Sequence, residues 1–224
     1  MSDNQKTLKS SIEFTGVGLH TGEDVHMVIE PAKINHGVKF QRVDLENQPI
    51  LNADINLVTD TQRCTTLEKD NVKIVTVEHL MSALYALGVN NVLIKMDSSE
   101  VPILDGSAKY FVEEIQKVGL KIQDAPLKYI YLPNPIHYTD PNSGSEILFV
   151  PANNFIISVV LDYENLALRT QYAEIRDLKD YSTEIAPCKT FVFLTELEKL
   201  AKANLIKGGG LENAIVVVDR EDTK

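Results

Sequence analysis

The order of strand-like and helix-like segments limits what this chain can fold into more than any other feature of its sequence. Short β-rich runs separated by Gly, Pro, Asn and Asp fill the first third, and RCTTLEKDNVKIVT predicts a hairpin around residues 68–71. A helix from Thr76 to Gly88, a buried strand in NNVLIKMD and a second helix that ends at Gly119 come next. This order predicts an α+β fold.

The same kind of pattern begins again after the second helix. Four strand-like runs are followed by the helical segment LTELEKLAKANL and a last strand in NAIVVVD. We therefore predict a boundary near residues 123–127, with a first α+β unit over 1–125 and a second over 126–224. The second unit looks incomplete, because by analogy with the first a further helix would be needed to cover its last strand.

Composition excludes several classes of protein. The 224 residues are 44% hydrophobic, which is enough for a core, and the net charge of −10 argues against a nucleic-acid partner. No apolar run approaches the roughly 20 residues that a membrane span needs. The polar N-terminus lacks a secretion signal, and Cys64 and Cys188 are too far apart for a compact metal knuckle. These features predict a cytoplasmic protein with reduced thiols.

The adjacent Glu78 and His79 are the first candidates for chemistry. They lie off the apolar face of the predicted helix, which comprises Val77, Leu80, Met81, Leu84 and Leu87. The positive end of the helix favours an anion and so explains Glu78 without any function. A helix-end role and a catalytic role for Glu78 therefore both stay open. The same end favours a neutral His79, which is the form that binds a metal. One histidine is not a zinc site, because zinc catalysis normally takes three protein ligands.

The segment HTGED offers another possible metal pair, His20 and Asp24. On a helix this spacing would aim both side chains at one ion, but the surrounding GVGLHTGED predicts a turn between strands. We expect His20 either to cap that turn or to line a cleft, and the residues favour the turn.

Six phrases, in order along the chain, resemble one known family. They are TLKSSIEFTGVGLHTG, RCTTL, TVEHLMSALYALGVNN, EVPILDGSA, APCKTF and NLIKGGGLENAIVV. The family is the zinc-dependent UDP-3-O-acyl-N-acetylglucosamine deacetylases, which act in the biosynthesis of lipid A for the Gram-negative outer membrane. The resemblance covers about residues 7–218. It implies two βααβ-type two-layer units with helices sandwiched between the sheets, and an active site between the units.

The resemblance also implies roles for individual residues. Glu78 matches the general base and His79 the first zinc ligand, so that zinc would acidify a water and Glu78 would take its proton during hydrolysis of the N-acetyl group. Thr190 matches a hydroxyl donor to the oxyanion, and Phe191 a residue near the nucleotide-sugar. The products would be acetate and a free amine.

A further match, at about residues 193–212, is to an insert that binds the substrate's acyl chain in the family. The expected wall consists of Phe193, Leu194, Leu197, Leu200 and Ile206, with space left by Gly208, Gly209 and Gly210. Without the resemblance, the same residues would be an ordinary buried helix face followed by a glycine stop. Arg63 and Lys189 are the basic residues we expect first at a phosphate.

Two elements of the family pattern have no match in this sequence. The later HxxxD motif, which supplies the other two zinc ligands, and the histidine general acid are not found, since His20 to Asp24 belongs to a different motif. We therefore expect this chain to be a fragment that is inactive alone. The alternative is a metal-free module that binds a nucleotide-sugar or acyl chain. The full-length protein could also carry a fused dehydratase domain, as some relatives in the family do. Acyl-chain length, oligomeric state and the choice between zinc and iron stay open.

Overall fold

A five-stranded sheet forms one side of the molecule. A computed structural model describes residues 4–163, 168–202 and 206–218. The sheet order is β2-β3-β9-β4-β5, and only the β4–β9 pair within it is parallel. Its strands are β2 (Ile12–Val17), β3 (Asp24–Pro31), β4 (Val38–Arg42), β5 (Ile50–Asn52) and β9 (Val92–Met96). Val92, Ile94 and Met96 alternate as buried residues along β9, so one face of the sheet points into the core.

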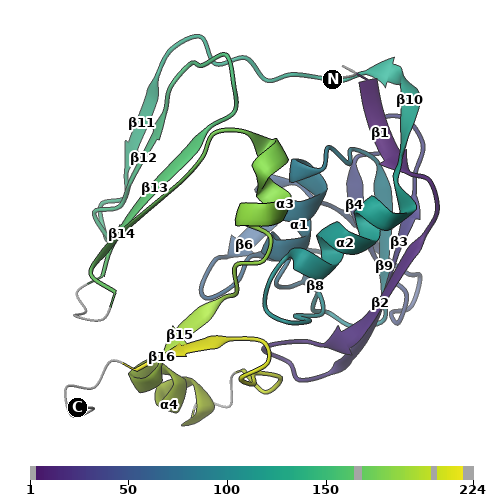
Figure 1. The fold of residues 1–224 in the computed structure, drawn as a ribbon. Coiled ribbons are helices and arrows are strands. Elements are labelled where there is room, and N and C mark those ends of the chain that lie inside the picture. The colour runs from purple at the N-terminus through teal and green to yellow at the C-terminus, as the bar shows by residue number, and fades with distance from the viewer. Residues whose placement is uncertain (1–3, 164–167, 203–205, 219–224) are drawn as a thin grey trace.

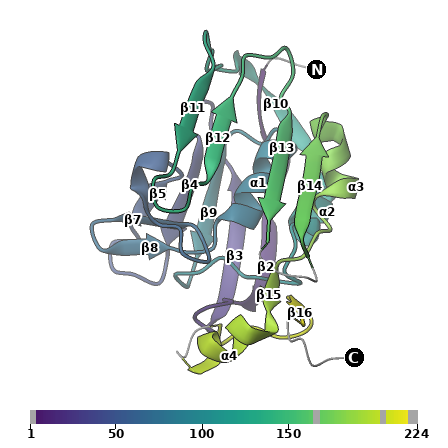
Figure 2. The ribbon, with the colours of Figure 1, turned by 90° about the vertical axis from the view of Figure 1, so that its left-hand side faces the viewer.

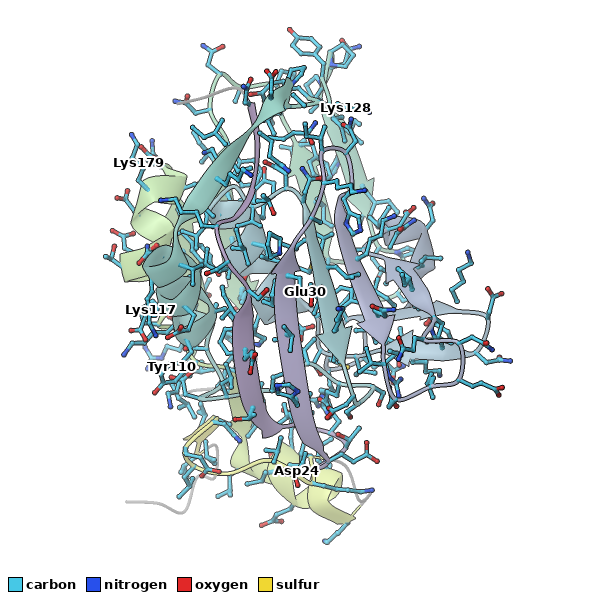
Figure 3. All side chains as sticks on the ribbon, turned by 90° about the vertical axis from the view of Figure 1, so that its right-hand side faces the viewer. Asp24, Glu30, Tyr110, Lys117, Lys128 and Lys179 are labelled. Atoms are coloured by element: carbon cyan, nitrogen blue, oxygen red, sulfur yellow. The ribbon has the colours of Figure 1, made fainter. Side chains whose placement is uncertain are left out.

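Two amphipathic helices cover that face, as predicted. Helix α1 (Glu78–Ala86) ends just before Gly88, and α2 (Lys109–Val118) ends at Gly119; both glycines have positive φ, which suits a helix stop. The core between sheet and helices includes Phe14, Phe40, Leu80, Leu84, Phe111 and Ile115. The outer face is polar: Figure 3 shows Glu30 there, and its carboxylate lies 2.8 Å from the Lys95 ammonium.

Smaller pairings complete this part of the chain. The predicted hairpin is confirmed as β7 (Thr66–Lys69) and β8 (Val72–Ile74), joined by two residues of positive φ, and β6 (Val58–Asp60) adds a third strand. A short 3-10 helix, η1 (Ile55–Leu57), precedes β6. Strand β1 (Asn4–Leu8) pairs with β10 (Leu120–Pro126), so residues near the predicted boundary pair with the start of the chain.

Two exposed hairpins stand on the other side of the helices. They are β11 (Ile136–Thr139) with β12 (Glu146–Phe149), and β13 (Ile157–Asp162) with β14 (Thr170–Ile175). The strand predicted in KYIYLPNPIHYT is shorter than expected, because Pro133 and Pro135 cannot donate to a ladder. Figures 1 and 2 show α1, α2 and α3 between these hairpins and the five-stranded sheet.

The last described segments, from residue 191 onward, lie at the lower end of Figure 1, below the short helix that precedes them. A 3-10 turn, η2 (Leu178–Asp180), leads into α3 (Tyr181–Glu184), and β15 (Phe191–Phe193) then pairs in parallel with β16 (Ile215–Val217). Helix α4 (Leu194–Lys202) follows β15 directly. Residues 203–205 of the predicted acyl-chain insert lie outside the described residues. Within the described ranges, no helix has both the length and the apolar composition needed to span a bilayer.

Candidate active site

The first turn of α1 presents Glu78 and His79, both half-buried. Thr76 precedes the helix in the left-handed region (φ 59°), which changes the chain direction before α1 begins. The Glu78 carboxylate is held from outside the helix as well, because its Oε2 accepts a hydrogen bond of 3.0 Å from the Thr65 backbone N–H. The carboxylate is therefore fixed both by α1 and by the loop of residues 61–65, which joins β6 to β7.

Burial controls the charge state of His79. Loss of solvent lowers the pKa of the imidazole below its usual value, while the negative charges of Glu78 and Asp105 act in the opposite direction. Burial is the larger effect, so the neutral ring is favoured. A neutral imidazole has a free lone pair for a metal, as expected from the helix position.

Asp105 belongs to the turn between β9 and α2, which contacts residues that are distant in the sequence. Its Oδ1 accepts hydrogen bonds from the Ser107 backbone N–H and hydroxyl, at 3.1 and 2.7 Å. The Lys189 ammonium lies 3.9 Å from Asp105 Oδ2 and donates to the Glu212 carbonyl at 2.6 Å. The Asp105 carboxylate is thus placed near both His79 and a lysine.

Thr190 is joined to the same turn through its backbone. Its N–H donates to the Gly106 carbonyl at 2.8 Å, and its carbonyl accepts from the Ile215 N–H at 2.9 Å. Gly106 itself needs to be glycine, because φ is 80° and an added Cβ would lie 1.8 Å from the Asn213 carbonyl oxygen. The site therefore combines the start of α1, the turn after β9 and the start of β15.

An apolar cavity of about 230 Å³ adjoins Thr190. Its walls include the predicted Phe191, Leu197, Leu200, Ile206 and Gly209, together with Arg63. Three other residues predicted for the acyl-chain site, Phe193, Leu194 and Gly208, do not line it, and neither does Lys189, which was expected at a phosphate. Phe193 instead packs edge-on against Phe191 and Tyr163.

Arg63 is engaged with a carboxylate. Its Nη1 and Nη2 donate to the two oxygens of Glu196 on α4, at 3.1 and 2.8 Å. The pairing raises the pKa of the Arg63 guanidinium and lowers the pKa of the Glu196 carboxyl. The expected phosphate contact of Arg63 stays a prediction.

Two further residues belong to the site: His20, for which lining a cleft was the less favoured of two alternatives, and Glu100, which the sequence did not single out. His20 lies in the wall of the cavity, and its Nε2 atom is buried with no hydrogen-bond partner among the described residues. Glu100 is fully buried, and its carboxylate accepts from the backbone N–H groups of His20 and Thr21 and from the hydroxyls of Thr21 and Thr76. A lone Glu before VPIL gives no sequence signal for such a position.

Cys64 lies close to Glu78 but is a poor nucleophile. Burial raises the pKa of its thiol, and the negative charge of Glu78 acts in the same direction. Among the residues that the structure describes, no three His, Cys, Asp or Glu side chains are grouped closely enough to hold a metal ion.

Comparisons with known proteins define the class of this fold and site. A family model described as UDP-3-O-acyl N-acetylglycosamine deacetylase matches residues 5–223. The chain belongs to this family.

Individual relatives agree with that assignment. The chain is 46% identical to a protein of Bacteroides thetaiotaomicron named "Bifunctional enzyme LpxC/FabZ", over 97% of this chain and 47% of the relative. It is 43% identical to the UDP-3-O-acyl-N-acetylglucosamine deacetylase of Chromohalobacter salexigens, over 96% of this chain and 71% of the relative. The corresponding protein of Legionella pneumophila is 41% identical. The chain spans about half the length of the bifunctional relatives.

Proposed function

We propose that the full-length protein hydrolyses the N-acetyl group of UDP-3-O-acyl-N-acetylglucosamine in a zinc-dependent reaction, as the committed step of lipid A biosynthesis in the cytoplasm. Membership of the deacetylase family supports the reaction. The observation that carries the proposal is the adjacent Glu78 and His79 at the start of α1, with the imidazole kept neutral by burial. A carboxylate beside a neutral metal ligand is one arrangement that hydrolyses amides, because the metal activates a water and the carboxylate takes its proton.

The residues of the site fit a zinc ion at His79. The neutral imidazole is a suitable ligand, and the nearby carboxylates of Glu78 and Asp105 favour a cation. When bound, zinc would supply Lewis acidity, which polarises a carbonyl and makes water easier to deprotonate. We propose that residues corresponding to the unmatched part of the relatives' sequences supply the remaining ligands and the general acid.

The chain's own residues perform the proton transfer and hold the substrate. Glu78 takes a proton from the attacking water, and the hydrogen bond from the Thr65 N–H keeps one carboxylate oxygen oriented for it. Thr190 donates from its hydroxyl to the developing oxyanion. Lys189, beside Asp105, stays the candidate for a phosphate contact. Acetate and an amine leave as products.

The cavity beside Thr190 is the proposed binding site for the acyl chain of the substrate. Its lining is mainly aliphatic and aromatic, and it includes the backbone of Gly209 and Gly210. Phe191 joins the cavity to the expected nucleotide-sugar position.

The wider architecture of the family also enters as a proposal. We propose two βααβ-type units with their helices between the sheets, the second completed by further sequence. The helices lie between two groups of strands, which supports this arrangement (Figure 1). The bifunctional relatives support a fused dehydratase domain as a possible partner in the full-length protein.

Metal analysis of the full-length protein tests the proposal. We expect zinc bound to the wild type and lost in His79→Ala, whereas His26→Ala retains it, because His26 is exposed on β3 beside Glu13. The alternative of a metal-free binding module predicts no bound metal and substrate binding that ignores a chelator. Equal zinc content in wild type and His79→Ala would contradict the assigned ligand.

A further inference from the structure

Arg63 and Glu196 connect two segments that are far apart in the sequence. The guanidinium donates to both carboxylate oxygens, at 3.1 and 2.8 Å, and the two residues are 133 positions apart. Two-point pairing fixes orientation as well as distance, which a single contact between flexible side chains does not. The Arg63 backbone is in the left-handed region (φ 67°), a conformation that non-glycine residues adopt when their surroundings require it.

The pair lies at the edge of the apolar cavity. Arg63 is one of its lining residues, and Glu196 directly precedes Leu197, which lines it from the first turn of α4. Leu200, one turn further along α4, also faces the cavity. A contact that fixes the position of Glu196 therefore also fixes the face of α4 that forms one wall of the apolar cavity.

The same loop also contacts the proposed general base. Two residues after Arg63, the Thr65 backbone N–H donates to Glu78 Oε2 at 3.0 Å. Residues 61–65 thus bridge α4 on one side and the Glu78 carboxylate on the other. A shift of α4 can therefore reach the Glu78 carboxylate through the Arg63–Glu196 pair, two residues of backbone and one hydrogen bond.

We propose that the Arg63–Glu196 pair is a clasp, which closes α4 over the acyl cavity and couples the filled cavity to the position of Glu78. The inference rests on the proposed function for the identity of the ligand as an acyl chain. Its consequence is that the pair determines affinity for substrates with a long acyl chain more than for those with a short one.

The competing role for Arg63 is the phosphate contact expected from sequence. A guanidinium has five N–H donors and Glu196 takes two of them, so with respect to the described residues three remain for an anion. The two roles predict different behaviour of Glu196. A clasp needs both residues equally, whereas a phosphate contact needs Arg63 and gains nothing from a neighbouring carboxylate.

The test is a double-mutant cycle in the full-length metal-loaded protein. The variants are Arg63→Ala, Glu196→Ala, the double variant, and the exchanged pair Arg63→Glu with Glu196→Arg. We expect each single variant to raise KM for a long-acyl substrate about threefold to fivefold, and the double variant to do no more than either. The exchanged pair should recover most of the loss. Lys117→Ala, which removes an exposed pair with Glu114 on α2, is the control.

Three results would overturn the clasp. One is a KM raised in Arg63→Ala but unchanged in Glu196→Ala, equally for long and short acyl substrates, which indicates the phosphate role. Another is a double variant whose increase in KM equals the product of the increases in the two single variants. The third concerns hydrogen exchange of the α4 amides. If the clasp holds α4, exchange should be faster in both single variants and slower again in the exchanged pair, and unchanged exchange rates would refute the clasp.

Hydrogen exchange also separates this proposal from the proposed function. If the wild-type full-length protein releases no acetate, the function has failed, and exchange of the α4 amides alone decides whether the pair holds the helix.

Discussion

Replacing Glu100 should distinguish loss of its charge from loss of its hydrogen bonds. In Glu100→Gln, the amide oxygen can take the place of Oε2, which accepts from the Thr21 N–H and hydroxyl and from the His20 N–H. The amide nitrogen then takes the place of Oε1, where the Thr76 hydroxyl can rotate and accept, while the His20 N–H keeps its bond to the amide oxygen. Only the strengthening that a charged acceptor gives is lost, so we expect a decrease in the free energy of unfolding of about 1–2 kcal/mol.

Glu100→Ala should be much more severe. It leaves the His20 and Thr21 backbone N–H groups without acceptors in a site where Glu100 is fully buried. Each orphaned donor costs about 1–3 kcal/mol, and the lost side-chain volume adds to this, for a total of about 3–6 kcal/mol. The turn that carries His20 into the cavity wall would be released at the same time.

Thermal unfolding of the full-length protein measures both variants. Glu30→Gln is the matched control, because its half-buried pair with Lys95 lies on the outer face of the sheet, where such a pair should contribute at most about 1 kcal/mol. The reasoning predicts that melting temperature falls in the order wild type, Glu100→Gln, Glu100→Ala. Equal melting temperatures for the two Glu100 variants would refute the argument from unpaired donors.

Three further changes test other parts of the site. Glu78→Gln should lower kcat about 10²- to 10⁴-fold with zinc content unchanged, because it removes the base and not a ligand; an active variant would contradict this. Because burial lowers the His79 pKa below its usual value of about 6.5, protons should compete with zinc at this ring only in more acidic solution than at an exposed histidine. Zinc affinity measured by titration should therefore hold as the pH is lowered from neutral past about 6.5 and fall only below that, and a fall that begins near neutral pH would show that the ring is not shielded. Gly106→Ala should destabilise by about 3 kcal/mol or more in thermal melts, since its Cβ would overlap the Asn213 carbonyl; a wild-type melt would exclude that overlap.

Local patterns were sufficient to predict much of the fold. The spacing of Leu80 and Leu84 with a glycine stop predicts α1, and Asp70 with Asn71 supplies the positive φ values of the β7–β8 turn. In contrast, the sequence places a boundary near residues 123–127, inside β10, because a new run of strand-like segments begins after it, whereas β10 is a strand because β1 pairs with it. Pairing partners distant in sequence supply what the local pattern lacks.

The candidate site divides in the same way. Glu78 and His79 are neighbours in the chain, so their proximity follows directly from the sequence. Glu100 is identified only once the fold brings the turn at His20 and the start of α1 together around it. The pairing of Arg63 with Glu196 likewise depends on where α4 packs. Periodicity carries no information on such contacts, because the partners belong to separate elements.

Acetate release from acylated UDP-N-acetylglucosamine by the full-length protein tests the central claim most directly. The account predicts release by the native protein, loss after chelation, recovery on adding zinc, and no recovery in His79→Ala. Substrate binding without acetate release, unaffected by chelation or zinc, would contradict the account and favour a metal-free binding module.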